Sequence, residues 1–171
     1  MSILKLKNSL ISQLKEDQHC MLALEKLLDE IPYDQMRYIG KMSFRSLLNR
    51  ALKTRNKYKS YKIIHQKTIQ KVHVKNPIFI TGLPRSGTTL LQNLIINNFQ
   101  IEGLRFWELL NPIPINNNKQ IDNILRKINA WFLITLVKKM GPNIIPMHPM
   151  NIFSFEECWH LFLMTFNVYN F

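Results

Sequence analysis

The sequence has few of the residues that mark several classes of protein. It holds only two cysteines, Cys20 and Cys158, which lie far apart and form no metal-ligand pair. No apolar run approaches the ~20 residues that a helix needs to span a bilayer. Lys5 and Lys7 interrupt the early apolar residues, where a secretory signal would need a continuous run. We therefore expect reduced thiols in a cytoplasmic protein without a transmembrane segment.

Acidic residues are also scarce, and their distribution is uneven. The chain of 171 residues has 23 Lys and Arg against 11 Asp and Glu, a net charge of +12. Residues 35–75 contain twelve of these basic residues and no acidic one. Such a block can attract nucleic acid, anionic lipid or an anionic cofactor, but it also fits a solvated helical face. We favour the solvated face, because charge runs are common and unspecific.

Much of the chain has apolar residues at helical spacing. The expected helices cover residues 3–30 with a break near Glu16 and Asp17, 34 to about 60, 121–139, and 155–166. Pro32 ends the first of them, and Asp34 is the expected N-cap of the second. Ser154 is the expected N-cap of the last helix, whose first turn would hold Glu156 and Glu157.

The stretch NPIFITGLPRSGTTLLQNLII, residues 76–96, has a different pattern. Its apolar run 77–80 predicts a buried strand, and Val72 and Val74 before it allow a short edge strand. A glycine-bounded loop, 82–87, follows, and apolar residues at helical spacing then predict a helix that begins near Thr88. Strand, loop and helix N-terminus in this order are typical of a phosphate cradle, in which loop amides and the helix dipole face one anion.

The loop departs from the nucleotide-hydrolase pattern G-x-x-x-x-G-K-[ST] at one position. Gly82, Gly87 and Thr89 fit that pattern, but Thr88 stands where the phosphate-binding lysine would be. The planar guanidinium of Arg85 suits bidentate contact with an oxyanion inside the loop. A simple glycine-containing turn with a Ser/Thr cap is the alternative, and the arginine among small and hydroxyl residues makes it the less favoured one.

PIFITGLPRSGTTLLQNLI closely resembles the 5′-phosphosulfate loop of sulfotransferases that use 3′-phosphoadenosine-5′-phosphosulfate (PAPS). Bacterial sulfotransferase-domain proteins with the loop PRSGTTLL are similar to it. The resemblance continues through RFWELLNP at 105–112, His148-Pro149 and Glu156-Glu157-Cys158. It implies a P-loop-type three-layer α/β fold with a parallel sheet, present here as an N-terminal, truncated part over residues 71–171. A mainly helical N-terminal region, 1–70, would precede it.

The resemblance also implies the donor site. The residues that would hold the 5′-phosphate of PAPS, without a metal ion, are Pro84, Arg85, Ser86, Gly87, Thr88 and Thr89. Arg85 would in addition neutralise charge on the leaving oxygen, which makes it a catalytic candidate.

A base must take the acceptor's proton, and three residues are candidates. Glu108 lies where related sulfotransferases place a catalytic glutamate, and Trp107 beside it would partly desolvate the carboxylate. A salt bridge with Arg105 or a helix cap is the structural alternative for Glu108. His148 is the second candidate, since imidazole titrates near neutral pH, although a structural role in its loop is favoured. Glu157 is expected mainly to cap a helix or to anchor a loop.

The expected acceptor is a hydroxyl or amine of a small molecule, lipid or saccharide, and no specific nucleic acid is expected as a partner. Because no segment here matches the family's site for the 3′-phosphate, a separate C-terminal half is a further expected partner. The chain alone should bind PAPS weakly and have little or no turnover. Two other functions stay open. A P-loop nucleotide-binding protein or small kinase would bind ATP with magnesium, and a basic helical nucleic-acid-binding module would show salt-dependent affinity that survives Arg85→Ala.

Overall fold

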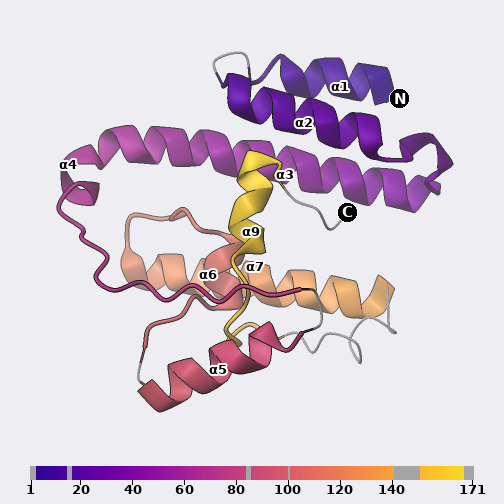
Figure 1. Cartoon of the computed structure of the whole chain (residues 1–171). Coiled ribbons are helices and arrows are strands. Elements are labelled where there is room, and N and C mark those ends of the chain that lie inside the picture. The colour runs from indigo at the N-terminus through magenta and orange to yellow at the C-terminus, as the bar shows by residue number, and fades with distance from the viewer. Residues whose placement is uncertain (1–2, 15–16, 84–85, 100, 141–150, 168–171) are drawn as a thin grey trace. The chain divides into compact units, whose positions relative to one another are not determined.

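The computed structural model describes residues 3–14, 17–83, 86–99, 101–140 and 151–167 (Figure 1). The chain divides into two compact units, one of Met1–His65 with Trp159–Phe171 and the other of Gln66–Cys158. The first unit contains α1 (Ile3–Ile11), α2 (Gln18–Glu30), η1 (Tyr33–Gln35), α3 (Tyr38–Ile64), α9 (Trp159–Phe162) and η2 (Leu163–Thr165). The second contains α4 (Gln66–Ile69), α5 (Thr88–Phe99), α6 (Phe106–Leu110) and α7 (Lys119–Met140).

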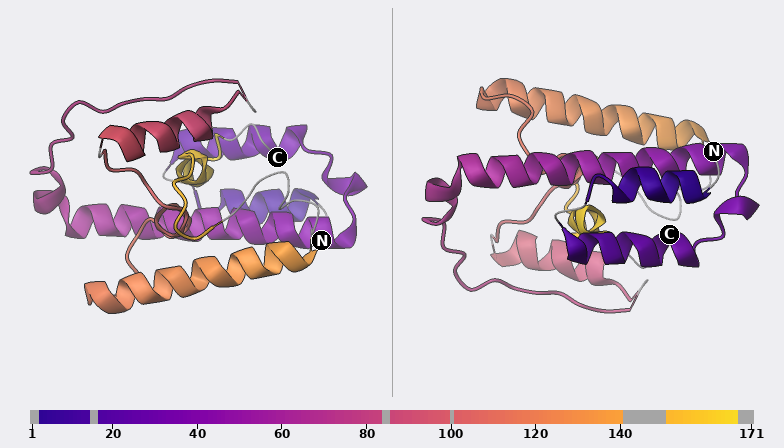
Figure 2. Two further views of the ribbon diagram at one scale, coloured as in Figure 1. Left: turned by 90° about the horizontal axis from the view of Figure 1, so that it is seen from below. Right: turned by 90° about the horizontal axis from the view of Figure 1, so that it is seen from above.

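Helices α1, α2 and α3 of the first unit share one apolar core. Figures 1 and 2 show α1 lying alongside α2. Apolar residues three and four apart fall on one face of a helix, and here these faces meet. The buried members of the core are Leu6, Leu10, Leu14, Cys20, Leu24, Leu28, Tyr33, Phe44, Leu48, Ala51, Leu52 and Phe166. Phe166 and the partly buried Leu163 bring the distant C-terminal segment into a core whose other residues come from the first 52.

The break expected near Glu16 and Asp17 is the start of a second helix. Asp17 is the N-cap of α2, and its Oδ1 accepts a hydrogen bond from the Cys20 amide at 3.3 Å. The other carboxylate oxygen, Oδ2, accepts hydrogen bonds from Arg55 and forms an ion pair with Lys59 at 3.1 Å. Burial alone would raise the pKa of Asp17, but these cationic partners and the Cys20 amide hold it well below its usual range. Asp17 thus joins the start of α2 to the middle of α3.

The expected N-cap of the second helical region is wrong. Asp34 lies in the short η1, and α3 begins after Arg37, whose backbone is extended and whose side chain makes no capping bond. Pro32 precedes η1, and the amide of Gln35 donates to the Pro32 carbonyl at 3.1 Å. This bond closes a separate turn before α3. Asp34 lies inside that turn, so it does not stand at the N-terminus of α3.

In the second unit α6 packs against α7, and the two helices form a smaller core. Its buried residues are Phe106, Trp107, Leu110, Ala130 and Ile134. Helix α5 begins at Thr88, as the sequence predicts, but none of its twelve residues, all of them described, is buried. In the part of the chain that the structure describes, no helix has the length and apolar character for crossing a membrane.

The expected three-layer α/β fold with a parallel sheet is wrong. Across the described residues the structure forms no strand, and an isolated antiparallel bridge, Arg105–Phe155, is its β contact. Residues 77–83 run without regular structure, and Phe79 is 83% exposed. A strand needs the hydrogen bonds of a neighbouring strand, and the segment with Val72 and Val74 supplies none. An apolar run is therefore not sufficient to make a sheet.

The last expected helix begins later than predicted. Glu156 and Glu157 lie before α9, and the Ser154 hydroxyl donates to the Asn151 carbonyl at 2.8 Å instead of capping a helix. The backbone here is bonded to the start of α6. The Ser154 carbonyl accepts from the Phe106 amide at 2.9 Å, and the Glu156 amide donates to the Leu104 carbonyl at 3.2 Å. These bonds hold the segment in a conformation that is not helical.

Candidate functional site

The candidate site lies at the loop before α5. Pro84 and Arg85 are outside the described residues, and the loop is described on both sides of them. The Ser86 amide donates to the Leu83 carbonyl at 3.2 Å, which closes a tight turn. Gly87 follows with a backbone φ of 86°, a left-handed conformation that residues other than glycine rarely adopt. Its carbonyl accepts the first bond of α5, from the Leu91 amide at 3.0 Å.

Gly82 is required for a different reason, because other side chains approach its backbone too closely to leave room for a Cβ atom. A Cβ atom at this position would lie 2.7 Å from the Ser86 Oγ and 2.8 Å from the Thr88 Cγ2. The incoming chain therefore passes directly against the loop and the first turn of α5. At Gly87, by contrast, a Cβ would meet nothing within 4 Å. The two glycines thus have different roles. Gly82 allows the incoming chain to pack against the loop, and Gly87 allows the backbone to turn into α5 at a position with open space beside it.

The first turn of α5 presents hydrogen-bond donors. The leading amides of any helix have no acceptor within the helix, and they lie at the positive end of its dipole. Thr88 and Thr89 add two hydroxyls at the same place, and the first turn contains no acidic residue. Amides, hydroxyls and dipole together favour binding of an anion.

Glu157 lies against this helix start, a contact that the sequence does not predict. Its Oε1 accepts hydrogen bonds from the hydroxyls of Thr88 at 3.1 Å and Thr89 at 2.9 Å. The neighbouring Glu156 is buried, and its carbonyl accepts from the Gln92 amide group at 3.4 Å. The segment before α9 is thus attached to α5 by two adjacent residues. Loop anchoring, the expected role of Glu157, is compatible with these bonds.

Glu108 takes part in the first turn of α6. Its Oε2 accepts a hydrogen bond from the Arg105 amide at 2.8 Å, so the helix-capping alternative noted for this residue is present. Trp107 beside it is buried, whereas Glu108 itself is only partly so. Among the described residues, no hydrogen bond joins Glu108 to the loop before α5. Its role as a base therefore stays a prediction.

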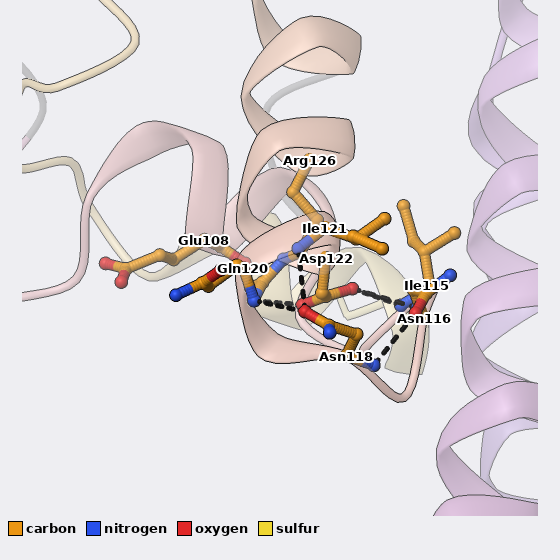
Figure 3. A network of polar contacts seen from close by, with 8 residues as sticks. All are labelled: Glu108, Ile115, Asn116, Asn118, Gln120, Ile121, Asp122 and Arg126. Atoms are coloured by element: carbon orange, nitrogen blue, oxygen red, sulfur yellow. Dashed lines mark hydrogen bonds and ion pairs between the residues drawn. The ribbon is translucent and has the colours of Figure 1, made fainter.

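A polar network behind Glu108 fixes α6 against the start of α7 (Figure 3). The Oδ1 of Asp122 accepts from the amides of Ile115 at 2.6 Å and Asn116 at 3.1 Å. Arg126 pairs with the other oxygen at 3.3 Å and also donates to the Glu108 carbonyl at 3.3 Å. Figure 3 shows the Glu108 carboxylate pointing away from Asp122. The network therefore positions the backbone of Glu108 and leaves its carboxylate outside.

The charges of this network are stabilised by their surroundings. Burial alone would raise the pKa of Asp122, but the two backbone amides and the Arg126 guanidinium lower it below its usual range. The guanidinium also lies over the Trp107 ring, 4.8 Å from its centroid. Arg126 is not among the predicted site residues, although its spacing of four residues from Asp122 is the signal of a helical ion pair.

Of the predicted site residues, the structure describes Ser86, Gly87, Thr88, Thr89 and Glu108. It brings the first four together in one loop and helix start, and it places Glu108 on a different helix. Pro84, Arg85 and His148 lie outside the described residues. The roles predicted for all of these residues stay predictions.

Comparison with known families assigns the chain to one of them. Residues 77–171, more than half of the chain, match the sulfotransferase family, and the chain belongs to that family. The match begins at the apolar run before the loop and includes both α5 and the segment that carries Glu157. Comparisons with curated proteins and with solved structures find no match.

Proposed function

We propose that this protein moves a sulfuryl group from PAPS to a hydroxyl or amine of a small molecule, lipid or saccharide. One observation carries the proposal: the part of the chain that belongs to the sulfotransferase family opens with a glycine loop and a helix start rich in donors. The family uses a sulfuryl donor, and the identity of that donor as PAPS is part of the proposal.

The described part of the loop fits an anionic donor. The hydroxyls of Ser86, Thr88 and Thr89 and the leading amides of α5 would hold the 5′-phosphate. The open space beside Gly87 leaves room for the ligand to approach the backbone. Arg85 would add a bidentate, permanently charged donor next to them.

Sulfuryl transfer breaks the bond between sulfur and the bridging phosphate oxygen and forms a bond from sulfur to the acceptor. The acceptor's proton must leave, and Glu108 is the first candidate to take it, with His148 second. Arg85 would stabilise the charge that develops on the departing phosphate.

A calorimetric titration with adenosine 3′,5′-bisphosphate tests the donor site. Arg85→Ala should weaken binding about ten- to hundredfold, the value of a charge-assisted hydrogen bond. Lys53→Ala is the matched control, because it removes an exposed cation from α3 and should change affinity less than about twofold.

The proposal fails if the wild-type protein does not bind the bisphosphate, or if both variants lose affinity equally. Tighter binding of ATP with magnesium than of the bisphosphate would favour a kinase-type function in its place. Transfer of labelled sulfate from PAPS to hydroxyl and amine acceptors then tests the reaction itself, and Glu108→Gln should lower its rate without lowering bisphosphate affinity.

A further inference from the structure

The Glu157 carboxylate occupies donors that a bound phosphate would need. An ionised carboxylate can only accept hydrogen bonds, and here one oxygen accepts from both threonine hydroxyls. The same two hydroxyls belong to the loop that we propose as the donor site. Glu157 therefore makes, with its own side chain, the kind of contact that an anionic ligand would make there.

This contact belongs to a segment whose two residues just before Glu157 are bonded to other parts of the unit. The Glu156 amide and carbonyl bond to Leu104 and to Gln92, and Phe155 forms the antiparallel bridge with Arg105. The backbone beside Glu157 thus stays close to the start of α5 independently of the carboxylate. Its side chain is exposed, so it can turn away into solvent while the segment remains in place.

The Glu157 carboxylate and a bound phosphate would both be negatively charged. A carboxylate and a phosphate at the same two hydroxyls would repel each other, and each hydroxyl has one proton to donate. We propose that Glu157 is a built-in competitor of the sulfuryl donor, holding Thr88 and Thr89 in the donor-free protein and releasing them when the 5′-phosphate binds. This inference rests on the proposed function, because it assigns a regulatory residue to the same site.

The alternative is that Glu157 only fastens the segment before α9 to α5. The two roles predict opposite changes in affinity. If Glu157 competes, removing its charge should tighten donor binding, because the hydroxyls become available and the repulsion disappears. If it only fastens the loop, removing it should weaken binding or leave it unchanged.

Titration of adenosine 3′,5′-bisphosphate into Glu157→Gln distinguishes these roles. The amide keeps the size of the side chain and one accepting oxygen, so a fastening bond can persist while the charge is removed. We expect affinity about three- to fivefold tighter than in the wild type, the scale of an interaction between exposed charges. Glu102→Gln removes the same charge from an exposed position in the same unit, and it should change affinity less than about twofold.

A second measurement uses the exposed Cys158, next to Glu157 in the chain, while Cys20 is buried. The bisphosphate should change the rate of Cys158 alkylation in the wild type, and this change should be smaller in Glu157→Gln, where no negative charge has to leave the threonine hydroxyls. Circular dichroism establishes that both variants are folded.

The outcomes separate the two proposals. A wild-type protein that fails to bind the bisphosphate overturns the proposed function and this inference together. A wild type that binds, with Glu157→Gln binding equally or more weakly, overturns only the competitor role. Unchanged affinity with lost sulfate transfer would also overturn it, because that result assigns Glu157 to proton transfer.

Discussion

The two units of the chain use similar apolar patterns with different results. In the first unit Leu24 on α2 is 0% exposed, because apolar faces of three helices meet. In the second unit Leu94 on α5 is 50% exposed, although it belongs to an equally regular helical stripe. On α7, Ile128 and Trp131 are also more than half exposed. A periodic apolar stripe therefore makes a helix, but only a partner surface makes a core.

Each unit also contains one buried or nearly buried aspartate, and the partners differ. Asp17 joins α2 to cations on α3, far along the chain, whereas Asp122 bonds mainly to nearby backbone amides and to Arg126 one turn away. The first arrangement stabilises tertiary contact between helices, and the second stabilises the local start of α7. Substitutions of the two aspartates can therefore separate the long-range from the local contribution to the free energy of unfolding.

The largest effect should come from paired leucine truncations. Leu24→Ala removes a fully buried side chain and should lower the free energy of unfolding by about 3 kcal/mol, as for other buried leucines. Leu94→Ala makes the same chemical change at a half-exposed site and should cost less than about 0.5 kcal/mol. Urea denaturation followed by circular dichroism measures both. Equal losses would show that the exposed face of α5 is covered in solution.

Replacement of Asp17 by Asn should have the next largest effect and lower the free energy of unfolding by about 2 kcal/mol. The amide can still cap α2, but the nearly buried Arg55 loses its counter-ion. Asp29→Asn is the matched control, because its pair with Lys7 is largely exposed, and it should cost less than about 0.5 kcal/mol. A loss no larger than that of the control would show that the ion pairs of Asp17 contribute nothing.

The pH dependence of stability sharpens the same comparison. Because the pKa of Asp17 is lower in the folded state, its stabilisation is complete above about pH 4, the ordinary value for aspartate, and decreases as pH falls below it. Unfolding free energy of the wild type should therefore decline below that pH. Asp17→Asn should reduce this decline and retain the part due to Asp122, whose pKa is also lowered.

The smallest effect on stability concerns the glycines. Gly87→Ala places a side chain at φ of 86° and should cost about 1 kcal/mol, with weaker bisphosphate binding. Gly40→Ala, inside α3 and with its nearest neighbour at an ordinary 3.7 Å, should instead stabilise by about 0.5–1 kcal/mol. Thermal unfolding compares the two variants, and destabilisation by both would contradict the conformational reason given for Gly87.

Local sequence signals predicted many of the helix limits correctly. The start of α5 at Thr88 and the end of the first helical region before Pro32 follow from residues within one or two turns of the boundary. The helix expected over 121–139 is α7. Asp34 and Ser154 were wrong as N-caps because each makes bonds inside a turn that helical spacing does not reveal.

The site was predicted in part for the same reason. The loop and its two threonines form one continuous stretch, so the sequence alone predicts that they lie together at the start of a helix. Glu157 is 69 residues from Thr88, and no local pattern predicts that its carboxylate accepts from that hydroxyl. The cap made by Glu108 was foreseen as an alternative, because it involves a partner only three residues away.

By itself, the sequence determined the longer helices, the glycine loop with its threonines and the resemblance to sulfotransferases. Only the tertiary structure decided that the apolar run before the loop pairs with no described strand, which leucines are buried, and that Glu157 lies on the threonines. The physical reason is the distance along the chain over which each interaction acts. Capping, periodicity and turn chemistry act over a few neighbouring residues, whereas burial and strand pairing depend on groups that the chain brings together from far apart.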